Sequence, residues 1–171
     1  CDYHNLKAVF VGMDPYPQPG IATGVAFANR LNTPKDCVSP SLRVIIECLE
    51  DNYNDLPNGE FDVTLDSWSR QGILLLNSAL TVAPNKPGSH ALLWRPFISS
   101  LIHNLSERKN GLIFVLFGSQ AESFEMYIDS PNVIKCQHPS FYARKNMKMP
   151  YIFRQIDDIM EKSGMDLIYW L

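Results

Sequence analysis

The sequence lacks several features that would place it in particular classes of protein. No apolar run approaches the roughly 20 residues of a membrane span, and the longest is Leu112–Phe117. The four cysteines form no C-x-x-C pair and show no zinc-ligand spacing. There is no excess of basic residues, because the formal net charge is −3. A membrane partner, a metal site and a generally basic nucleic-acid binder are therefore not expected, although a local basic patch remains compatible with these numbers.

The composition is that of a folded domain. The 171 residues are 46% hydrophobic and 19% charged, and they contain no internal repeat. A chain of this size buries roughly two thirds of its unfolded surface, so it folds without disulfides or a structural metal. We expect a single domain over residues 1–171. We therefore expect the cysteines to be reduced thiols, which predicts an intracellular protein of the cytoplasm or the nucleus.

Four short apolar segments predict strands at 7–12, 72–77, 112–117 and 132–136. They do not alternate with polar residues, which is typical of strands buried on both faces of a parallel sheet. Apolar residues at helical spacing predict helices around 42–49, 97–105, 121–128 and 152–160, the first with Ser39 as N-cap. The alternation predicts an α/β fold of three layers, α/β/α, around a central, largely parallel four-stranded sheet.

Polar side chains follow each predicted strand where it ends. In open α/β sheets, ligands bind beyond the carboxyl ends of the strands. The loop after the first strand is stiffened by three prolines, and such rigidity suits a positioned carboxylate better than an ordinary turn. The residues expected at one edge are Asp14, Tyr16, Asn77, Ser119, His138 and Ser140.

Several motifs, in order along the chain, resemble those of the uracil-DNA glycosylase family. They are DPY at 14–16, GVAF at 24–27, WSRQGILLLN at 68–77, SH at 89–90, FGSQA at 117–121 and HPS at 138–140. Each tripeptide alone is weak, but the ordered set covers most of the chain and is very specific. The resemblance implies hydrolysis of the N-glycosidic bond of deoxyuridine in DNA, with the nucleotide flipped into a pocket and without cofactor or metal.

The resemblance also implies roles for individual residues. Asp14 would orient the attacking water and stabilise the cationic sugar, and His138 would donate a hydrogen bond to uracil O2. Asn77 would read uracil N3–H and O4 with its amide. Tyr16 would exclude the methyl group of thymine, and Phe27 would stack on the base. Met13 stands where the family usually has Gln, and its main-chain N–H would take over that contact with uracil.

DNA contacts are expected on the same face. Ser41, Ser119 and Ser140 would bind phosphates, while Arg144 and Lys145 belong to a basic stretch that also contains Lys148. Pro17 replaces the family's usual His, which removes one phosphate contact. Tyr142 aligns with the family's intercalating Leu and would act as a wedge. The acidic stretch 47–66, with seven acids and no Lys or Arg, is expected away from the DNA.

Two alternatives to a uracil-DNA glycosylase stay open at this point. One is a glycosylase for another modified base, and the other is a non-enzymatic or weakly active DNA-binding or replication accessory domain of the same fold. The expected partners are uracil-containing DNA and either a proteinaceous glycosylase inhibitor or a replication protein, with the chain as a monomer. Only eleven residues precede Gly12, fewer than the family usually has, so we expect either a compact member or a chain whose start is missing.

Overall fold

The computed structural model describes residues 1–53 and 61–171, and its centre is a four-stranded sheet. The strands are β1 (Ala8–Gly12), β2 (Ile73–Asn77), β3 (Ile113–Phe117) and β4 (Val133–Cys136). Their order across the sheet is β2-β1-β3-β4, and all three pairings are parallel. The predicted sheet is confirmed, and each predicted strand differs from the observed one by a single residue at its start.

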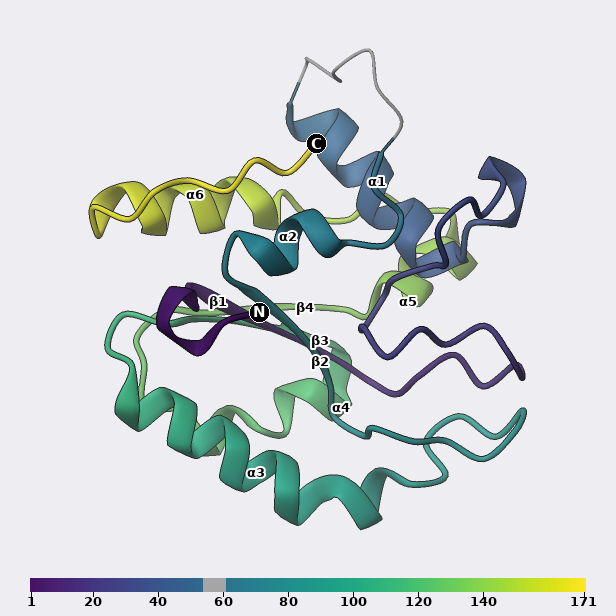
Figure 1. Ribbon diagram of the computed structural model, residues 1–171, viewed down its shortest axis with the longest axis horizontal. Coiled ribbons are helices and arrows are strands. Elements are labelled where there is room, and N and C mark those ends of the chain that lie inside the picture. Colours follow the sequence, from purple (N-terminus) through teal and green to yellow (C-terminus); the bar gives the residue numbers. More distant parts are fainter. Residues whose placement is uncertain (54–60) are drawn as a thin grey trace.

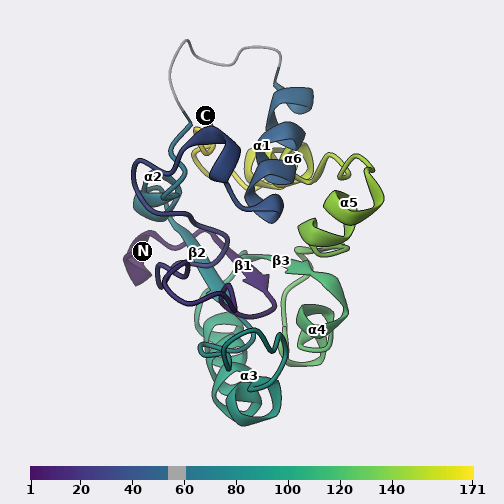
Figure 2. The same ribbon diagram turned by 90° about the vertical axis from the view of Figure 1, so that its right-hand side faces the viewer.

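Helices cover both faces of the sheet, which confirms the three-layer architecture (Figures 1 and 2). One face packs against α1 (Pro40–Asn52), α2 (Asp66–Arg70), α5 (Pro139–Lys145) and α6 (Ile152–Lys162). The other face packs against α3 (Ala91–Arg108) and α4 (Gly118–Glu122). Three short 3-10 helices complete the described part of the chain, at Tyr3–Asn5, Lys35–Cys37 and Glu125–Tyr127. Within that part, no helix is long and apolar enough to cross a membrane.

The helix predictions differ from the structure mainly in the short elements. The helices expected at 42–49 and 152–160 lie inside α1 and α6, and the one at 97–105 lies inside the longer α3. The helix expected at 121–128 is wrong as a single element, because α4 ends at Glu122 and a 3-10 turn follows. The sequence patterns missed α2 and α5, since helices of five and seven residues are too short to show a periodicity.

An aromatic cluster fixes the C-terminal segment against the sheet. Trp170 lies 5.2 Å from Trp68 and 5.0 Å from Phe153 between ring centroids, and Phe10 of β1 stacks on it at 6.2 Å. The Trp68 indole N–H donates to the Trp170 carbonyl at 3.0 Å. All four aromatic side chains are buried. Aromatic pairs in this geometry stabilise the fold beyond the effect of their buried apolar area. The cluster therefore gives the strands a rigid support.

Candidate active site

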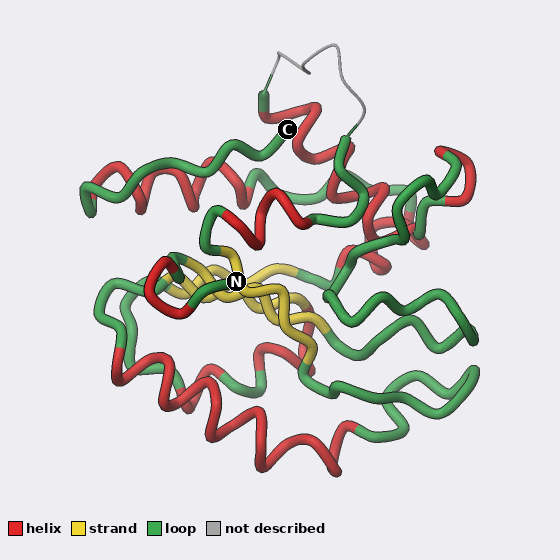
Figure 3. The backbone as a smooth tube through the Cα atoms, in the orientation of Figure 1, coloured by secondary structure: helices red, strands yellow, loops and turns green. Residues whose placement is uncertain are grey.

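The loops that leave the carboxyl ends of the strands meet at one edge of the sheet. The register pairs Gly12 with Asn77 and Phe117 with Cys136, so β1, β2, β3 and β4 end close to one another. Figure 3 shows the long loops after β1 and β2 lying together beyond this edge. The structure therefore brings the predicted polar residues to a common region, as the parallel sheet required.

Asp14 is held by the loop that follows β2. Its Oδ2 accepts a hydrogen bond from the Gly88 backbone N–H at 2.6 Å. A second bond between the same two loops runs from the Asn85 N–H to the Pro17 carbonyl at 2.9 Å. Partial burial raises the pKa of Asp14 above its usual 3.8, while the Gly88 N–H lowers it by favouring the charged form. The carboxylate is thus oriented by a backbone donor from a distant segment.

Asn77 and Phe27 converge above Gly12 at the end of β1. A Cβ at Gly12 would lie 2.6 Å from Asn77 Oδ1 and 2.9 Å from Phe27 Cζ, so only glycine fits there. Phe27 has φ of +67°, a conformation that costs free energy for a bulky residue and that clusters at functional sites. Its ring centroid is 5.8 Å from that of His138. An amide, an aromatic ring and an imidazole therefore share one small region.

His138 is the N-cap of α5, and its hydrogen bonds define its tautomer. Nδ1 accepts from the Ser140 backbone N–H at 3.2 Å and lies 2.9 Å from the Ser140 Oγ. Because Nδ1 is an acceptor, the neutral ring carries its hydrogen on Nε2. Burial, together with the nearby Arg144 charge, lowers the pKa of His138 to about 4. At neutral pH, His138 is thus a neutral imidazole, and its Nε2–H makes no hydrogen bond within the described residues.

Tyr16 and Met13 are anchored by backbone contacts. The Tyr16 hydroxyl donates to the Phe27 carbonyl at 2.8 Å, which ties the first loop to the segment that carries Phe27. The Met13 carbonyl accepts from the Ala79 N–H at 3.0 Å and from the Ser78 hydroxyl at 2.6 Å. The loop after β1, which carries Asp14, is therefore fixed both to the segment with Phe27 and to the start of the loop after β2.

The serines expected to bind phosphate lie in different environments. Ser119 is exposed in α4, directly after β3. Ser140 is half-buried, and the Arg144 guanidinium donates to its Oγ at 3.1 Å. Ser41 lies in the first turn of α1 and is buried. Arg144 and Lys145 are both exposed in the last turn of α5.

The structure does not place Tyr142 as a wedge. Its side chain is only 7% exposed and belongs to the core between α5 and the sheet. The reason is helical geometry, because α5 turns this position inward while its neighbours Arg144 and Lys145 face solvent. The expectation of a projecting Tyr142 is therefore wrong.

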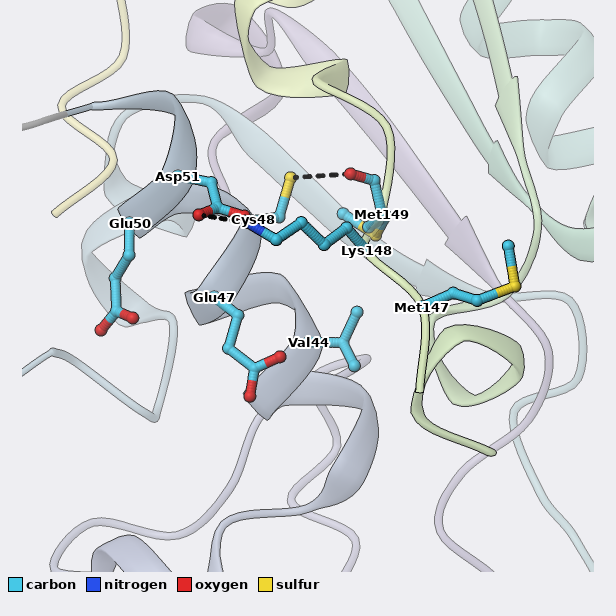
Figure 4. A pocket seen from close by; sticks show the side chains of 8 residues that line it. All are labelled: Val44, Glu47, Cys48, Glu50, Asp51, Met147, Lys148 and Met149. Carbon is cyan, nitrogen blue, oxygen red and sulfur yellow. Dashed lines mark hydrogen bonds and ion pairs between the residues drawn. The ribbon is translucent and has the colours of Figure 1, made fainter. Parts of the chain in front are cut away.

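The expected separation of acidic and basic residues is also wrong in part. Lys148 Nζ lies 2.8 Å from Asp51 Oδ2, and Glu47 lines the same pocket (Figure 4). That pocket, of about 210 Å³, lies between α1 and residues 147–149. The acids of 47–53 thus pack beside the end of the basic stretch, because α1 packs against α5. Residues 54–60 of the acidic stretch lie outside the described residues.

The sequence patterns did not single out Gly88, and they included His90 only as part of a motif, with no role. Gly88 supplies the N–H that holds Asp14, and the turn signal Pro87-Gly88 could have indicated a special backbone conformation there. His90 is linked to the same loop, because its Nδ1 lies 2.9 Å from Thr81 Oγ1, which also accepts from the Trp94 indole at 2.7 Å. Within 1–53 and 61–171, no three His, Cys, Asp or Glu side chains gather as metal ligands would.

The sequence of this chain is similar to those of known uracil-DNA glycosylases. A family model described as the uracil DNA glycosylase superfamily matches residues 1–160. Uracil-DNA glycosylase from Campylobacter jejuni is 37% identical, over 99% of this chain and 73% of the relative. That of Gallid herpesvirus 2 is 36% identical, over 99% of this chain and 54% of the relative.

Solved structures show the same relationship. The crystal structure of mimivirus uracil-DNA glycosylase superposes with a TM-score of 0.83 at 29% identity, covering 99% of this chain and 69% of that one. A variant of the mimivirus enzyme in complex with UGI gives a TM-score of 0.80 at 28% identity, over 97% of this chain and 69% of that one. The similarity therefore extends over the whole sheet and its helices.

Proposed function

The chain belongs to the uracil-DNA glycosylase superfamily and is a DNA-repair hydrolase that excises uracil, and we propose that Asp14 and His138 perform this chemistry. The observation that carries the assignment of roles is that a held carboxylate and a neutral imidazole with a donating Nε2–H follow strands whose carboxyl ends lie at one edge of the sheet. The two groups come from the ends of β1 and β4. Their protonation states suit a reaction in which the sugar becomes cationic and the base becomes anionic.

Asp14 acts as an ionised carboxylate. Burial raises its pKa, and the Gly88 N–H opposes this shift by stabilising the charged form, which is the form that the proposed role requires. A fixed negative charge next to the sugar stabilises an oxocarbenium-like transition state, and one carboxylate oxygen can orient the attacking water. The backbone bond to Gly88 keeps this charge in place without reorganisation during the reaction.

His138 acts as a neutral hydrogen-bond donor. Its low pKa means that the ring does not transfer a proton from an imidazolium at neutral pH. The Nε2–H instead stabilises the charge that builds on uracil O2 as the glycosidic bond breaks. Ser140 fixes both the tautomer and the ring orientation through Nδ1.

Recognition of the base falls to Asn77 and Phe27, which meet above Gly12, and to Tyr16, whose hydroxyl donates to the Phe27 carbonyl. The Asn77 amide offers one donor and one acceptor, which match uracil O4 and N3–H and oppose the pattern of cytosine. Phe27 stacks on the base, and Tyr16 closes the side near C5. The positive φ of Phe27 and the close fit over Gly12 support a shaped pocket, because both restrict where the ring can lie. We assign Met13 to the same pocket through its backbone.

DNA binding is proposed for the surface around the same edge. Ser119 is exposed there, and Arg144 and Lys145 add positive charge. The Ser140 hydroxyl already contacts His138 and Arg144, so a phosphate would bind it in place of the Arg144 contact. Ser41 would act through the first turn of α1, where backbone N–H groups point outward. A proteinaceous inhibitor is a further proposed partner, supported by the mimivirus structure with UGI. A replication protein as partner, a monomeric state and an intracellular location stay predictions.

The direct test uses a single-stranded oligonucleotide with one uracil. After incubation with the protein, alkaline cleavage at abasic sites reveals excision, and free uracil is measured in parallel. The matched control is the same oligonucleotide with thymine or cytosine at that position. Release of uracil by the native protein and its loss in Asp14→Asn is the expected pair of results. Equal release by both proteins would remove Asp14 from the mechanism.

A further inference from the structure

The Tyr16 hydroxyl makes two hydrogen bonds, and their directions are determined. Its oxygen lies 2.8 Å from the Phe27 carbonyl and 2.5 Å from Ser39 Oγ. A carbonyl only accepts, so the single Tyr16 hydroxyl proton points to Phe27. The Ser39 hydroxyl must therefore be the donor to Tyr16. The Tyr16 hydroxyl therefore donates one hydrogen bond, to Phe27, and accepts one, from Ser39.

Ser39 occupies the N-cap of α1 but its side chain does not cap the helix. A serine at this place usually accepts a bond from the N–H two or three residues later. Here the hydroxyl is turned toward Tyr16 instead. The helix loses a stabilising contact in exchange for the contact with Tyr16, which indicates that the position serves more than helix formation.

The backbone of Ser39 is fixed independently of Tyr16. Its N–H donates to Asn29 Oδ1 at 2.9 Å, and the Asn29 N–H donates to the Val63 carbonyl at 2.8 Å. Ser39 and Asn29 are both buried, at 7% and 4% exposure. The donor that reaches Tyr16 is therefore attached to a rigid part of the protein and cannot follow the ring if the ring moves.

We propose that Ser39 is a positioning residue for base selection, which holds the Tyr16 ring at the C5 side of the uracil pocket and so strengthens rejection of 5-substituted uracils. This inference rests on the proposed function, because Tyr16 closes the pocket only if the base lies on Phe27. Ser39 does not touch the base. It acts through Tyr16, whose remaining bond to the Phe27 carbonyl leaves the ring free to tilt when the second bond is removed.

The test compares excision of uracil, 5-fluorouracil and 5-bromouracil from otherwise identical oligonucleotides. The measured quantity is kcat/KM for 5-bromouracil divided by kcat/KM for uracil. In Ser39→Ala, we expect this ratio to be about fivefold higher than in the native protein, the change that corresponds to the free energy of one hydrogen bond. The smaller fluorine should give a smaller rise. Dividing each variant's ratio by the native ratio cancels the intrinsic reactivity of the substituted bases. Ser39→Thr, which keeps a hydroxyl, should retain the native ratio.

Two further variants separate positioning from general damage. Ser106→Ala removes a buried hydroxyl on α3 that accepts from the Asp129 N–H, and it should leave the ratio unchanged. Tyr16→Phe removes both bonds, so adding Ser39→Ala to it should produce no further rise. Melting temperatures show that each variant is folded.

The results distinguish this inference from the proposed function. A native protein that releases no uracil contradicts the proposed function. A native protein that releases uracil, with Ser39→Ala showing the same ratio as Ser106→Ala for both substituted bases, overturns the role of Ser39 alone. An additive rise in the double variant with Tyr16→Phe would also overturn it, because Ser39 would then act by another route.

Discussion

The bond from the Gly88 N–H to Asp14 permits a sharp test, because Gly88 has φ of +78° and only glycine adopts this conformation without strain. In Gly88→Ala, the new Cβ would lie 3.3 Å from Met13 Cε, in addition to the backbone strain. The left-handed conformation costs an L-residue about 1–2 kcal/mol, so the backbone is expected to rotate and turn its N–H away from Asp14.

The expected loss follows from the bond that is broken. A hydrogen bond to a charged group contributes about 1.5–3 kcal/mol, which corresponds to roughly 10- to 100-fold in the rate of uracil release. The pH dependence should change as well. The Gly88 N–H lowers the pKa of Asp14, so its loss raises that pKa, and the acid limb of the rate profile moves to higher pH.

Gly111 provides a matched control. It has the same φ of +78°, lies before β3 at the opposite end of the sheet, and has no heavy atom within 4 Å of an added Cβ. Gly111→Ala should therefore lose similar stability but keep its rate of uracil release. Single-turnover excision across pH, with urea unfolding of both variants, measures the two effects separately. Identical rates and acid limbs in Gly88→Ala and Gly111→Ala would refute the reasoning.

Four other outcomes can be measured. Asp14→Asn should bind DNA normally but release uracil on the order of 10²-fold more slowly, and single-turnover rates beside binding isotherms check both. Asn77→Asp replaces a donor with an acceptor, so it should lose preference for uracil over cytosine; a native preference would show that Asn77 does not read the base. Arg144→Ala with Lys145→Ala should lower the slope of log affinity against log salt on duplex DNA by up to about 1.8, and an unchanged slope would place the DNA elsewhere. The His138 pKa of about 4, against 6.5 when unfolded, means that the unfolded chain takes up the proton first as pH falls. The contribution of His138 to the free energy of unfolding is complete above pH 6.5 and declines by about 3 kcal/mol as the pH falls to 4. Urea unfolding between pH 6.5 and pH 4 should therefore show a smaller decrease in this free energy for His138→Asn than for the native protein. An equal decrease in the two proteins would contradict the assigned pKa.

The sequence by itself determined the sheet and the identity of the site's chemical groups. Strands buried on both faces are continuous apolar runs, and such runs are visible without any knowledge of contacts. Parallel strands bring their carboxyl ends to one edge, so the residues that follow them had to converge there. The placement of Asp14, Asn77 and His138 at this edge was predictable for this reason, their roles stay predictions, and the ordered motifs indicated the family to which the chain belongs.

Only the tertiary structure decided how those groups are held. Asp14 and Gly88 are 74 positions apart, and Tyr16 and Ser39 are 23 apart, so no local pattern connects either pair. The inward orientation of Tyr142 likewise depends on a short helix whose ends are set by its neighbours. Residue types and spacing are encoded locally, whereas hydrogen-bond direction, burial and pKa arise from packing between distant segments, which is why they became visible only in the folded chain.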